Sequence, residues 1–407
     1  MNTSPHTPFL IVGLQPWDTT IGSNCKNIAV ELAKRTKVLY INIPLDWNTV
    51  VKNSSDSQDH IEFRKNVRKG KTDSLVEVEE NLYVFTPSSI ILSINTLPPG
   101  RLFDYFNLRN NRKIAAEVKP ILKKLNFQEF FLFNDNDMFR SYYMKELLKP
   151  LLSIYYSRDN LISTDYFKKH GTRIEPKLIE KSDLSVANST FLRDYCRQYN
   201  PKSYYIGQGC DLSLFDPNKS YSKPQDMEGI ANPIIGYIGF LTSMRLDITL
   251  LENLAESKKD WSFVLVGPED SSFTGSRLHQ MENVYFLGSK KPEELSTYLN
   301  FFDVSINPQL INDMTIGNYP RKVDEYLAMG KPVIATATKA MSVFAEHCYL
   351  ATNASEYEIL IDKALSENSR SKREARINFA NEHTWDNSID NLLSAIQKTI
   401  NLKGKNN

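Results

Sequence analysis

The chain has 407 residues, of which 41% are hydrophobic and 24% charged, and its formal net charge is +1 at pH 7. This composition is typical of a globular protein and excludes collagen, a coiled coil and wholesale disorder, while the length predicts two domains. No apolar stretch approaches the roughly 20 residues of a membrane-spanning helix, and the start of the chain lacks a signal-peptide core, so we expect a cytoplasmic protein. The four cysteines form no Cys-x-x-Cys pair, which disfavours a disulfide framework or a thiolate zinc site.

In chain order, apolar runs and polar breaks repeat the pattern of strand, loop and helix. The first half opens with an expected strand at 9–12, an amphipathic helix at 23–34 and a second strand at 38–43. The polar segment 53–72 is expected to be a long mobile excursion. Further strands are expected at 83–86, 130–133, 154–156 and 184–187, and further helices at 112–125 and 139–147.

The second half repeats this pattern. Strands are expected at 234–238, 263–266, 284–287, 304–307 and 332–335, and helices at 248–258, 293–301, 321–329 and 356–365. Such alternation builds parallel sheets that are covered on both faces. We therefore expect an α/β chain with two Rossmann-like, doubly wound domains at 1–205 and 233–384 and a linker at 206–232. A last helix within 385–407 is a candidate to pack back across the junction.

The charge is unevenly distributed. Residues 1–205 carry 29 Lys and Arg against 22 Asp and Glu, a net +7, whereas residues 206–407 carry 20 against 26, a net −6. A basic half suits anionic phosphates or a membrane surface, and a solvated helical surface explains it equally. Lys119, Lys123 and Lys124 recur at helical spacing beside apolar residues, so this helix either lies on anionic lipid or packs its apolar side into the core.

Several catalytic motifs are missing from the sequence. The segment GLQPWDTTIG after the first strand lacks G-x-G-x-x-G, which disfavours a dinucleotide cofactor. The six histidines have no metal-binding spacing, and no G-x-S-x-G marks a serine nucleophile. We expect neither a metal site nor a nucleic-acid partner.

Two polar loops follow expected strands and suit an anion. In 19–24, which includes Gly22, backbone N–H groups at a helix start can hold an anion, although Ser23 or Thr20 can simply cap the helix. The loop in 236–247 includes Gly239 and places Arg245 before a helix, where it can bind a diphosphate or form a surface ion pair with Asp247.

The most specific segment is GNYPRKVDEYLAMGKPVIAT, residues 317–336. Pro320 suits a helix start and Gly330 a helix end. Arg321 and Lys322 place cations where the helix dipole disfavours them, and a bound anion would relieve that conflict. An intrahelical pair between Arg321 and Glu325 is the structural alternative.

At these residues the sequence resembles GT-B glycosyltransferases of the family 4 type, especially bacterial capsule, exopolysaccharide and teichuronic-acid transferases. The family signature is E-G-F-P followed after four residues by E-A-M-A-x-G-x-P-V. The matching residues here are Pro320, Glu325, Leu327, Ala328, Gly330, Pro332 and Val333. Two further matches are Asn188, Ser189, Phe191 and Leu192, and the segment IGQGCDLSLF ending at Phe215.

The resemblance implies roles for single residues. Glu325 would accept hydrogen bonds from the ribose hydroxyls. The residues implied around the diphosphate are Gly22, Gly239, Arg245, Arg321 and Lys322, of which Arg245 and Lys322 would also act in catalysis. Asp159 stands in an Arg-Asp pair where many relatives have His-Asp, near the acceptor. Gly317 replaces the family's first glutamate, so the donor-sugar contact is assigned to Gly317 and Asn318.

The resemblance also implies a function. Two domains facing a cleft would transfer a sugar, with retention, from a nucleoside diphosphate sugar to a growing, lipid-linked cell-surface glycan. The expected partners are this donor, the glycan acceptor and the anionic inner face of the cytoplasmic membrane, with no metal or other cofactor. Two alternatives are a nucleotide-sugar 2-epimerase and a non-catalytic sugar-nucleotide-binding protein.

Overall fold

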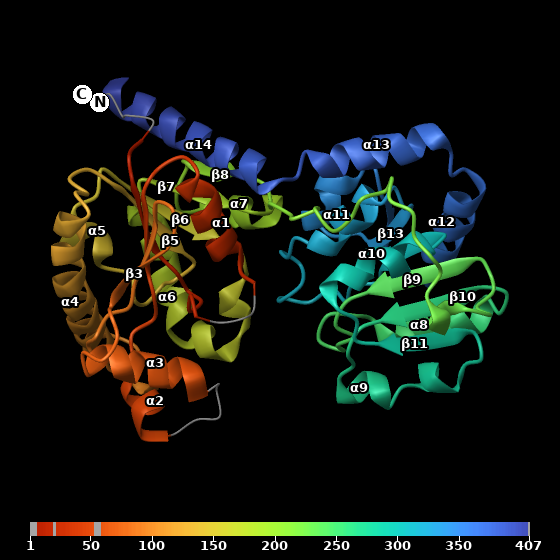
Figure 1. The fold of residues 1–407 in the computed structure, drawn as a ribbon, viewed down its shortest axis with the longest axis horizontal. Coiled ribbons are helices and arrows are strands. Elements are labelled where there is room, and N and C mark those ends of the chain that lie inside the picture. Colours follow the sequence, from red (N-terminus) through yellow and green to blue (C-terminus); the bar gives the residue numbers. More distant parts are fainter. Residues whose placement is uncertain (1–5, 19–21, 53–57, 406–407) are drawn as a thin grey trace. The chain divides into compact units, whose positions relative to one another are not determined.

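The computed structural model describes residues 6–18, 22–52 and 58–405. The chain folds into two compact units (Figure 1). Unit 1 comprises Met1–Gly207 and Ser388–Asn407, and unit 2 comprises Gln208–Asn387. The chain therefore leaves unit 1 once, after Gly207, and returns to it at Ser388.

Unit 1 is built on a sheet with the strand order β3-β4-β2-β1-β5-β6-β7-β8. Its strands are β1 (Phe9–Val12), β2 (Val38–Ile41), β3 (Leu75–Glu79), β4 (Leu82–Phe85), β5 (Phe131–Asp135), β6 (Leu152–Ser157), β7 (Leu184–Ala187) and β8 (Ser203–Tyr205). All neighbours are parallel except the edge pair of β3 and β4. Strands β1, β2, β5, β6 and β7 are buried throughout, as a parallel sheet covered on both faces requires.

Helices cover this sheet. They are α1 (Asn24–Ala33), α2 (Trp47–Lys52), α3 (Gln58–Arg68), α4 (Arg101–Lys124), α5 (Met144–Leu148), α6 (Asp165–Lys181), α7 (Thr190–Arg197) and, from Ser388 onward, α14 (Trp385–Lys405). The hydroxyl of Ser23 caps α1 by accepting a hydrogen bond from the N–H of Lys26 at 3.2 Å. The capping alternative for this segment is therefore present in the structure.

The expectation of a mobile excursion over 53–72 is wrong for its described part. Residues 58–68 form α3, while 53–57 lie outside the described residues. Ile61 and Val67 are buried, and Arg64 forms an ion pair of 2.9 Å with Asp18. Two buried apolar residues on a charged helix are enough to attach it to unit 1, although they are too few to produce a clear sequence period.

The helix α4 carries the lysines that were considered for membrane contact. Its apolar side, including Ile114, Val118 and Leu122, packs into the core of unit 1. The membrane-lying interpretation of this apolar side is therefore wrong, because the residues that would enter the lipid are already buried. Lys119, Lys123 and Lys124 remain exposed at the rim.

The exposed lysines of α4 can still attract an anionic membrane. At about 1 kcal/mol for each cation near the surface, we expect weak, salt-sensitive co-sedimentation with anionic vesicles and none with neutral vesicles. Changing Lys119, Lys123 and Lys124 together to Glu should abolish it. If wild type stays in the supernatant with anionic vesicles at low salt, membrane contact through α4 is wrong. Among the described residues, no helix is long and apolar enough to cross a bilayer.

Unit 2 is built on a parallel sheet with the order β11-β10-β9-β12-β13-β14. Its strands are β9 (Ile234–Ile238), β10 (Ser262–Val266), β11 (Val284–Gly288), β12 (Val304–Asn307), β13 (Val333–Thr336) and β14 (Tyr349–Ala351). Its helices are α8 (Ile248–Ser257), α9 (Ser271–Thr274), α10 (Pro292–Asn300), α11 (Arg321–Ala328), α12 (Ala354–Ser366) and α13 (Arg370–Asn381). The two parallel-dominated sheets confirm the expected pair of Rossmann-like domains.

The segment 206–232 differs from the expected linker. From Gln208 onward it belongs to unit 2. Phe215, Met227 and Ile230 are buried in the hydrophobic core of that unit. Phe215 stands among polar residues, and Gly229 separates Met227 from Ile230, so no regular period predicts a strand or helix here, yet each apolar residue fills a place in the core.

Candidate functional site

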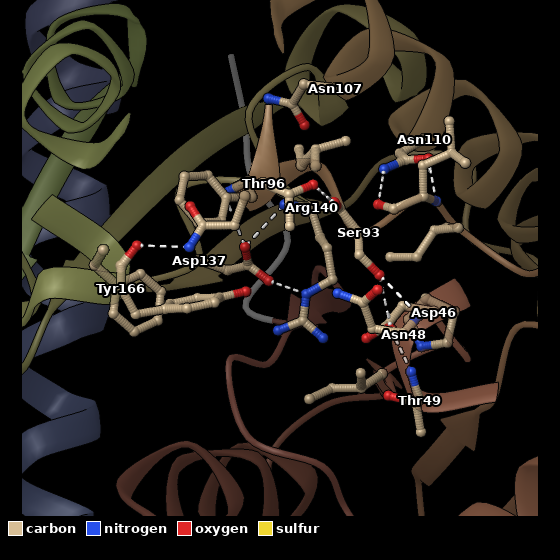
Figure 2. Close-up of a pocket in the computed structure, with 18 of the residues that line it drawn as sticks. Asp46, Asn48, Thr49, Ser93, Thr96, Asn107, Asn110, Asp137, Arg140 and Tyr166 are labelled. Atoms are coloured by element: carbon tan, nitrogen blue, oxygen red, sulfur yellow. Dashed lines mark hydrogen bonds and ion pairs between the residues drawn. The ribbon is translucent and has the colours of Figure 1, made fainter. Parts of the chain in front are cut away.

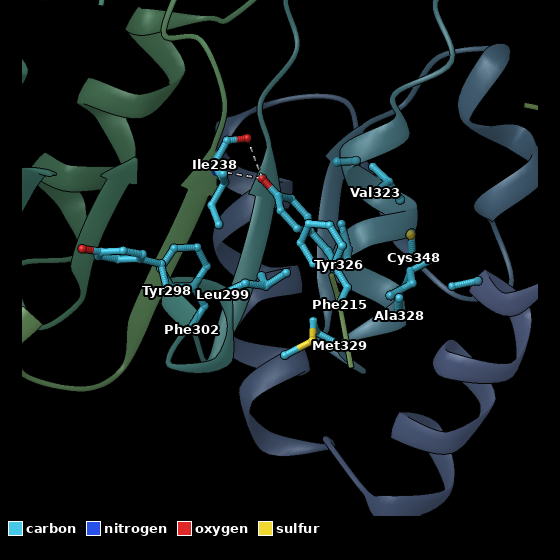
Figure 3. Close-up of a cluster of buried hydrophobic side chains, with 14 of the residues drawn as sticks. Phe215, Ile238, Tyr298, Leu299, Phe302, Val323, Tyr326, Ala328, Met329 and Cys348 are labelled. Atoms are coloured by element: carbon cyan, nitrogen blue, oxygen red, sulfur yellow. Dashed lines mark hydrogen bonds between the residues drawn. The ribbon is translucent and has the colours of Figure 1, made fainter. Parts of the chain in front are cut away.

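The site in unit 2 begins with the way α11 is attached to β9. The apolar residues Val323, Tyr326 and Leu327 of this helix are buried in the core. Figure 3 shows Val323 and Tyr326 there. The Tyr326 hydroxyl accepts a hydrogen bond from the N–H of Ile238 at 2.8 Å and donates one to its carbonyl oxygen at 3.2 Å. Because Ile238 is the last residue of β9, Tyr326 fixes α11 against the carboxyl end of a central strand, where ligands of open α/β sheets bind.

Lys322 lies one turn before Tyr326 on α11. Its ammonium group lies 3.9 Å from the centre of the Tyr237 ring and hydrogen-bonds the hydroxyl of that tyrosine. A side chain at Gly239 would bring its Cβ within 2.6 Å of Lys322 Nζ, and Gly239 has a φ of 143°. The backbone conformation therefore favours glycine at 239, and a larger residue would also displace the lysine ammonium group.

The charges around Lys322 are poorly balanced. Burial lowers the pKa of Lys322 to about 7; nearby Glu325 opposes this shift, and Arg245 adds to it. Burial also raises the pKa of Glu325, while Arg321 and Lys322 lower it. Arg245 and Glu325 thus each lie within electrostatic reach of Lys322. A bound anion beside Lys322 and Arg245 would restore the protonated lysine.

Arg245 and Arg321 were each expected either to bind an anion or to form an ion pair with a nearby carboxylate. In the part of the chain that the structure describes, Arg245 forms no ion pair with Asp247, and Arg321 forms none with Glu325. Asp247 instead caps α8 by accepting a hydrogen bond from the N–H of Leu250 at 3.0 Å. The side chains of Arg245 and Arg321 are exposed, so both remain available to a ligand.

Asp324, which precedes Glu325 on α11 and is fully buried, was not predicted from the sequence. It accepts hydrogen bonds from Cys210 Sγ and the Tyr319 hydroxyl, both at 3.2 Å, and its Oδ1 lies 2.6 Å from His383 Nδ1. Burial raises the pKa of Asp324, and the hydrogen bond with His383 lowers it. This network holds the side of α11 that faces away from Lys322. The only signal in the sequence is a polar residue at an inward helical position.

Gly317 and Asn318 lie on the loop between β12 and α11. Gly317 is buried, and the N–H of Asn318 donates to the Thr315 carbonyl oxygen at 3.0 Å. The loop therefore leads directly into the helix that carries Lys322 and Glu325. With glycine at 317, the side chain that would reach a donor sugar from this position is absent.

The candidates in unit 1 form a separate group. Gly22 is exposed just before α1, and the neighbouring residues 19–21 lie outside the described residues. Asp159 follows β6 and its side chain is 43% exposed. Its carboxylate lies 2.5 Å from Arg158 Nη1, and Arg158 Nε lies 2.7 Å from the buried Asp135. Asp159 is thus a fixed, partly exposed carboxylate.

Comparison with known proteins gives these sites a context. Residues 232–366 match the family model of glycosyl transferases group 1, and this range includes Gly239, Arg245, Lys322 and Glu325. Sucrose-phosphate synthase from Thermosynechococcus elongatus aligns over 98% of the chain and 100% of its own, with a TM-score of 0.65 and 15% identity. Trehalose 6-phosphate synthase from Burkholderia multivorans covers the same shares with a TM-score of 0.66 and 11% identity.

The chain has the GT-B fold, and its residues 232–366 resemble a glycosyl transferase group 1 domain. Anabaena HepE, whose structure contains UDP, shares this fold over 96% of the chain and 100% of its own, with a TM-score of 0.62 and 15% identity. TuaH of Bacillus subtilis strain 168, assigned provisionally as a teichuronic acid biosynthesis glycosyltransferase, is 26% identical to this GT-B chain over 242 residues. That alignment spans 56% of the chain and 60% of TuaH. Together, these similarities support a GT-B glycosyltransferase.

Proposed function

We propose that the chain is a hexosyltransferase that moves a sugar from a nucleoside diphosphate sugar to a growing glycan. The observation that carries this proposal is the meeting of Lys322, Arg245 and Glu325 at the carboxyl end of β9. Within residues 6–18, 22–52 and 58–405, neither Lys322 nor Arg245 has a carboxylate in ion-pair contact, and such cations suit a diphosphate. The third is a carboxylate that suits ribose hydroxyls. The group 1 domain match covers all three residues.

The proposed roles follow from the chemistry of each group. Glu325 holds the ribose by accepting two O–H hydrogen bonds. Lys322, Arg245 and Arg321 bind the diphosphate and stabilise the negative charge that develops on it as the sugar leaves. Gly22 and Gly239 contribute backbone that can approach the phosphates closely. Holding the donor and the acceptor together supplies the remaining rate enhancement.

The acceptor and the stereochemistry are further parts of the proposal. A lipid-linked, cell-surface glycan is supported by the resemblance to capsule and teichuronic-acid transferases and by the name of TuaH. Retention of the anomeric configuration is supported by the same family resemblance. Asp159, fixed by Arg158, is proposed to orient the acceptor. A place at the inner face of the cytoplasmic membrane would bring the chain to such an acceptor.

The proposal is tested by screening nucleoside diphosphate sugars for turnover, with the released nucleoside diphosphate as the readout. Without an acceptor, a transferase releases the nucleoside diphosphate slowly, by transferring the sugar to water; with an acceptor it releases it faster, by transferring the sugar to the acceptor hydroxyl. A 2-epimerase would instead convert the free donor into its epimer. A non-catalytic protein, which the glycine at 317 favours, would bind the nucleotide without turnover.

We also expect metal-independent activity. The structure's described residues include no group of three or more His, Cys, Asp or Glu that could hold a metal ion. If Lys322 and Arg245 neutralise the diphosphate, activity should persist within about twofold in excess EDTA. Loss of activity in EDTA that magnesium or manganese restores would contradict this assignment of the cationic role.

A further inference from the structure

Unit 2 contains a cavity of about 330 Å³ at the amino end of β14. It lies between the residues just before this strand, the end of α12 and the first half of α13. The strands of this sheet run parallel, so the amino end of β14 and the carboxyl end of β9, where Lys322 lies, are at opposite ends of the sheet. The cavity is therefore separate from the proposed nucleotide site. Its volume is within the roughly 300–1,000 Å³ of small-molecule pockets.

Arg376 of α13 is a buried cation in the wall of this cavity, with only 4% of its surface exposed. Its Nε and Nη2 donate to the Gly330 carbonyl oxygen at 3.0 and 2.9 Å, and Nη2 also donates to Asn368 Oδ1 at 2.5 Å. In the described part of the chain, Nη1 has no hydrogen-bond partner, and no carboxylate is in ion-pair contact with the guanidinium. A buried charge of this kind is costly until an opposite charge compensates it.

Two lysines add positive charge to the lining. Lys372 Nζ lies 3.1 Å from Glu367 Oε1, and Lys363 Nζ lies 3.9 Å from the same oxygen. The Tyr349 hydroxyl also donates to this oxygen at 2.7 Å. One carboxylate thus serves both lysines, while the second carboxylate of the lining, Glu346, is exposed to solvent. With Arg376, the lining has three cations against two carboxylates, so an anion is attracted to it.

The cavity of unit 1 at the carboxyl ends of β1, β2 and β5 provides a comparison, because its arginine is compensated. Figure 2 shows Arg140 pointing toward Asp137 in that cavity. Arg140 Nε lies 2.5 Å from the Asp137 carboxylate. Arg376 lacks such a partner among the residues that the structure describes. Its charge is therefore available to a ligand in a way that the charge of Arg140 is not.

We propose that the cavity at the amino end of β14 binds the oxyanion group of a small metabolite, a phosphate or a carboxylate, through Arg376 and Lys372. An oxygen of this group accepts a hydrogen bond from Arg376 Nη1 and compensates the buried guanidinium. Lys372 precedes Arg376 by four residues on α13, so both cations lie on one side of the helix. Glu367 can accept hydrogen bonds from hydroxyls on the rest of the ligand. The site is independent of the proposed transfer reaction.

Calorimetry on the full chain tests this proposal. The probes are inorganic phosphate, glycerol 3-phosphate and malate as anions, and glycerol as the neutral compound. At least one anion should bind with a Kd of about 1 mM or lower, whereas glycerol should not bind. Lys372→Gln should weaken that anion about fivefold, which is the upper end for an exposed ion pair. Arg376→Gln should weaken it about tenfold or more, because a charge-assisted hydrogen bond is lost.

The two variants differ in their risk to the fold. Arg376 also holds Gly330 at the end of α11, so thermal unfolding must first show that Arg376→Gln is folded. Lys372 is exposed, so Lys372→Gln decides the test even if the other variant does not fold. Lys258→Gln is the matched control, since Lys258 pairs with Asp362 of α12 at 2.7 Å and does not line the cavity. It should leave anion affinity unchanged.

Two further measurements locate the anion. Lys322→Met should retain its binding, because the nucleotide site is elsewhere. In NMR spectra of the histidine rings, the signals of His347, which lines the cavity, should shift on addition of the anion, whereas those of His279 should not. The proposal is wrong if none of the three anions binds below about 10 mM. It is also wrong if Lys258→Gln weakens binding as much as Lys372→Gln, if Lys322→Met abolishes binding, or if the His347 signals stay unchanged.

Discussion

Replacing Lys322 with methionine should weaken nucleoside diphosphate binding by about 10- to 150-fold, because a charge-assisted hydrogen bond contributes about 1.5–3 kcal/mol. The same change should raise the melting temperature of the free protein. Burial lowers the pKa of Lys322 to about 7, so its ammonium form is less favourable in the folded state than in water. Methionine fills a similar volume without that cost. Calorimetry and thermal unfolding measure the two effects separately.

The lowered pKa of Lys322 also predicts how stability and nucleotide affinity change with pH. The ordinary pKa of lysine is 10.5, so the unfolded chain binds more protons than the folded chain between about pH 7 and 10.5. The stability gain from Lys322→Met should be largest below pH 7 and should shrink as the pH rises through this window. Nucleotide affinity of wild type should fall above pH 7 as Lys322 loses its proton. The Lys322→Met variant should lack this part of the pH dependence.

Lys331 offers a matched control for the lysine substitution. Burial lowers its pKa to about 8, and its Nζ donates to the Asn300 carbonyl oxygen at 2.6 Å, away from Glu325 and Arg245. Lys331→Met should leave nucleotide affinity unchanged. If both variants lose nucleotide binding equally, or if Lys322→Met binds as wild type does, the diphosphate role of Lys322 is wrong.

Replacing Glu325 with alanine should weaken nucleoside diphosphate binding by about 1.5–3 kcal/mol, because two hydrogen bonds between the carboxylate and the ribose would be lost. A nucleotide that lacks the ribose 2′-hydroxyl isolates this contact. Wild type should discriminate against the deoxy form, and Glu325→Ala should discriminate much less. Calorimetry of wild type and Glu325→Ala, each with the ribose nucleotide and its 2′-deoxy form, measures the coupling free energy between Glu325 and the 2′-hydroxyl.

Glu374→Ala is the control for the glutamate substitution, since Glu374 is exposed on α13 and pairs with Arg370 at the surface. It should bind both nucleotides as wild type does. If the losses of binding free energy from Glu325→Ala and from removal of the 2′-hydroxyl were additive, Glu325 and the 2′-hydroxyl would not be in contact. The ribose assignment would then have to be abandoned, even if Glu325 proved necessary for binding.

Local sequence patterns were sufficient to predict most of the sheets. The strands at 9–12, 184–187, 234–238 and 304–307 are confirmed at both ends, because buried parallel strands are short apolar runs with clear polar breaks. The pattern of apolar residues did not predict elements that bury few side chains. Helix α3 has few apolar residues and produced no recognisable period. The antiparallel edge strand β3 is largely exposed and was not expected, although its residues from Val76 to Glu79 alternate between apolar and charged.

The sequence was sufficient to predict which residues belong to the candidate site, but not which contacts they make. The motif around Glu325 identified the helix, but the contact of Lys322 with Tyr237 joins residues 85 positions apart. The approach of that lysine to Gly239 depends on how Tyr326 attaches α11 to β9. Asp324 was missed for the same reason, since its partners Cys210 and His383 come from opposite ends of unit 2. Long-range packing decides these contacts.

The chain's two passages between the units have a consequence for protein engineering. The N–H of Cys210 donates to the His383 carbonyl oxygen at 2.9 Å, so the first and last segments of unit 2 are neighbours. In unit 1, the Ser388 hydroxyl lies 3.5 Å from the Gly207 carbonyl oxygen. Unit 2 is thus an insertion in unit 1, between two positions, Gly207 and Ser388, that lie next to each other. Residues 208–387 are encoded by one contiguous gene fragment that can be removed, and a short peptide linker from 207 to 388 would then join the two parts of unit 1.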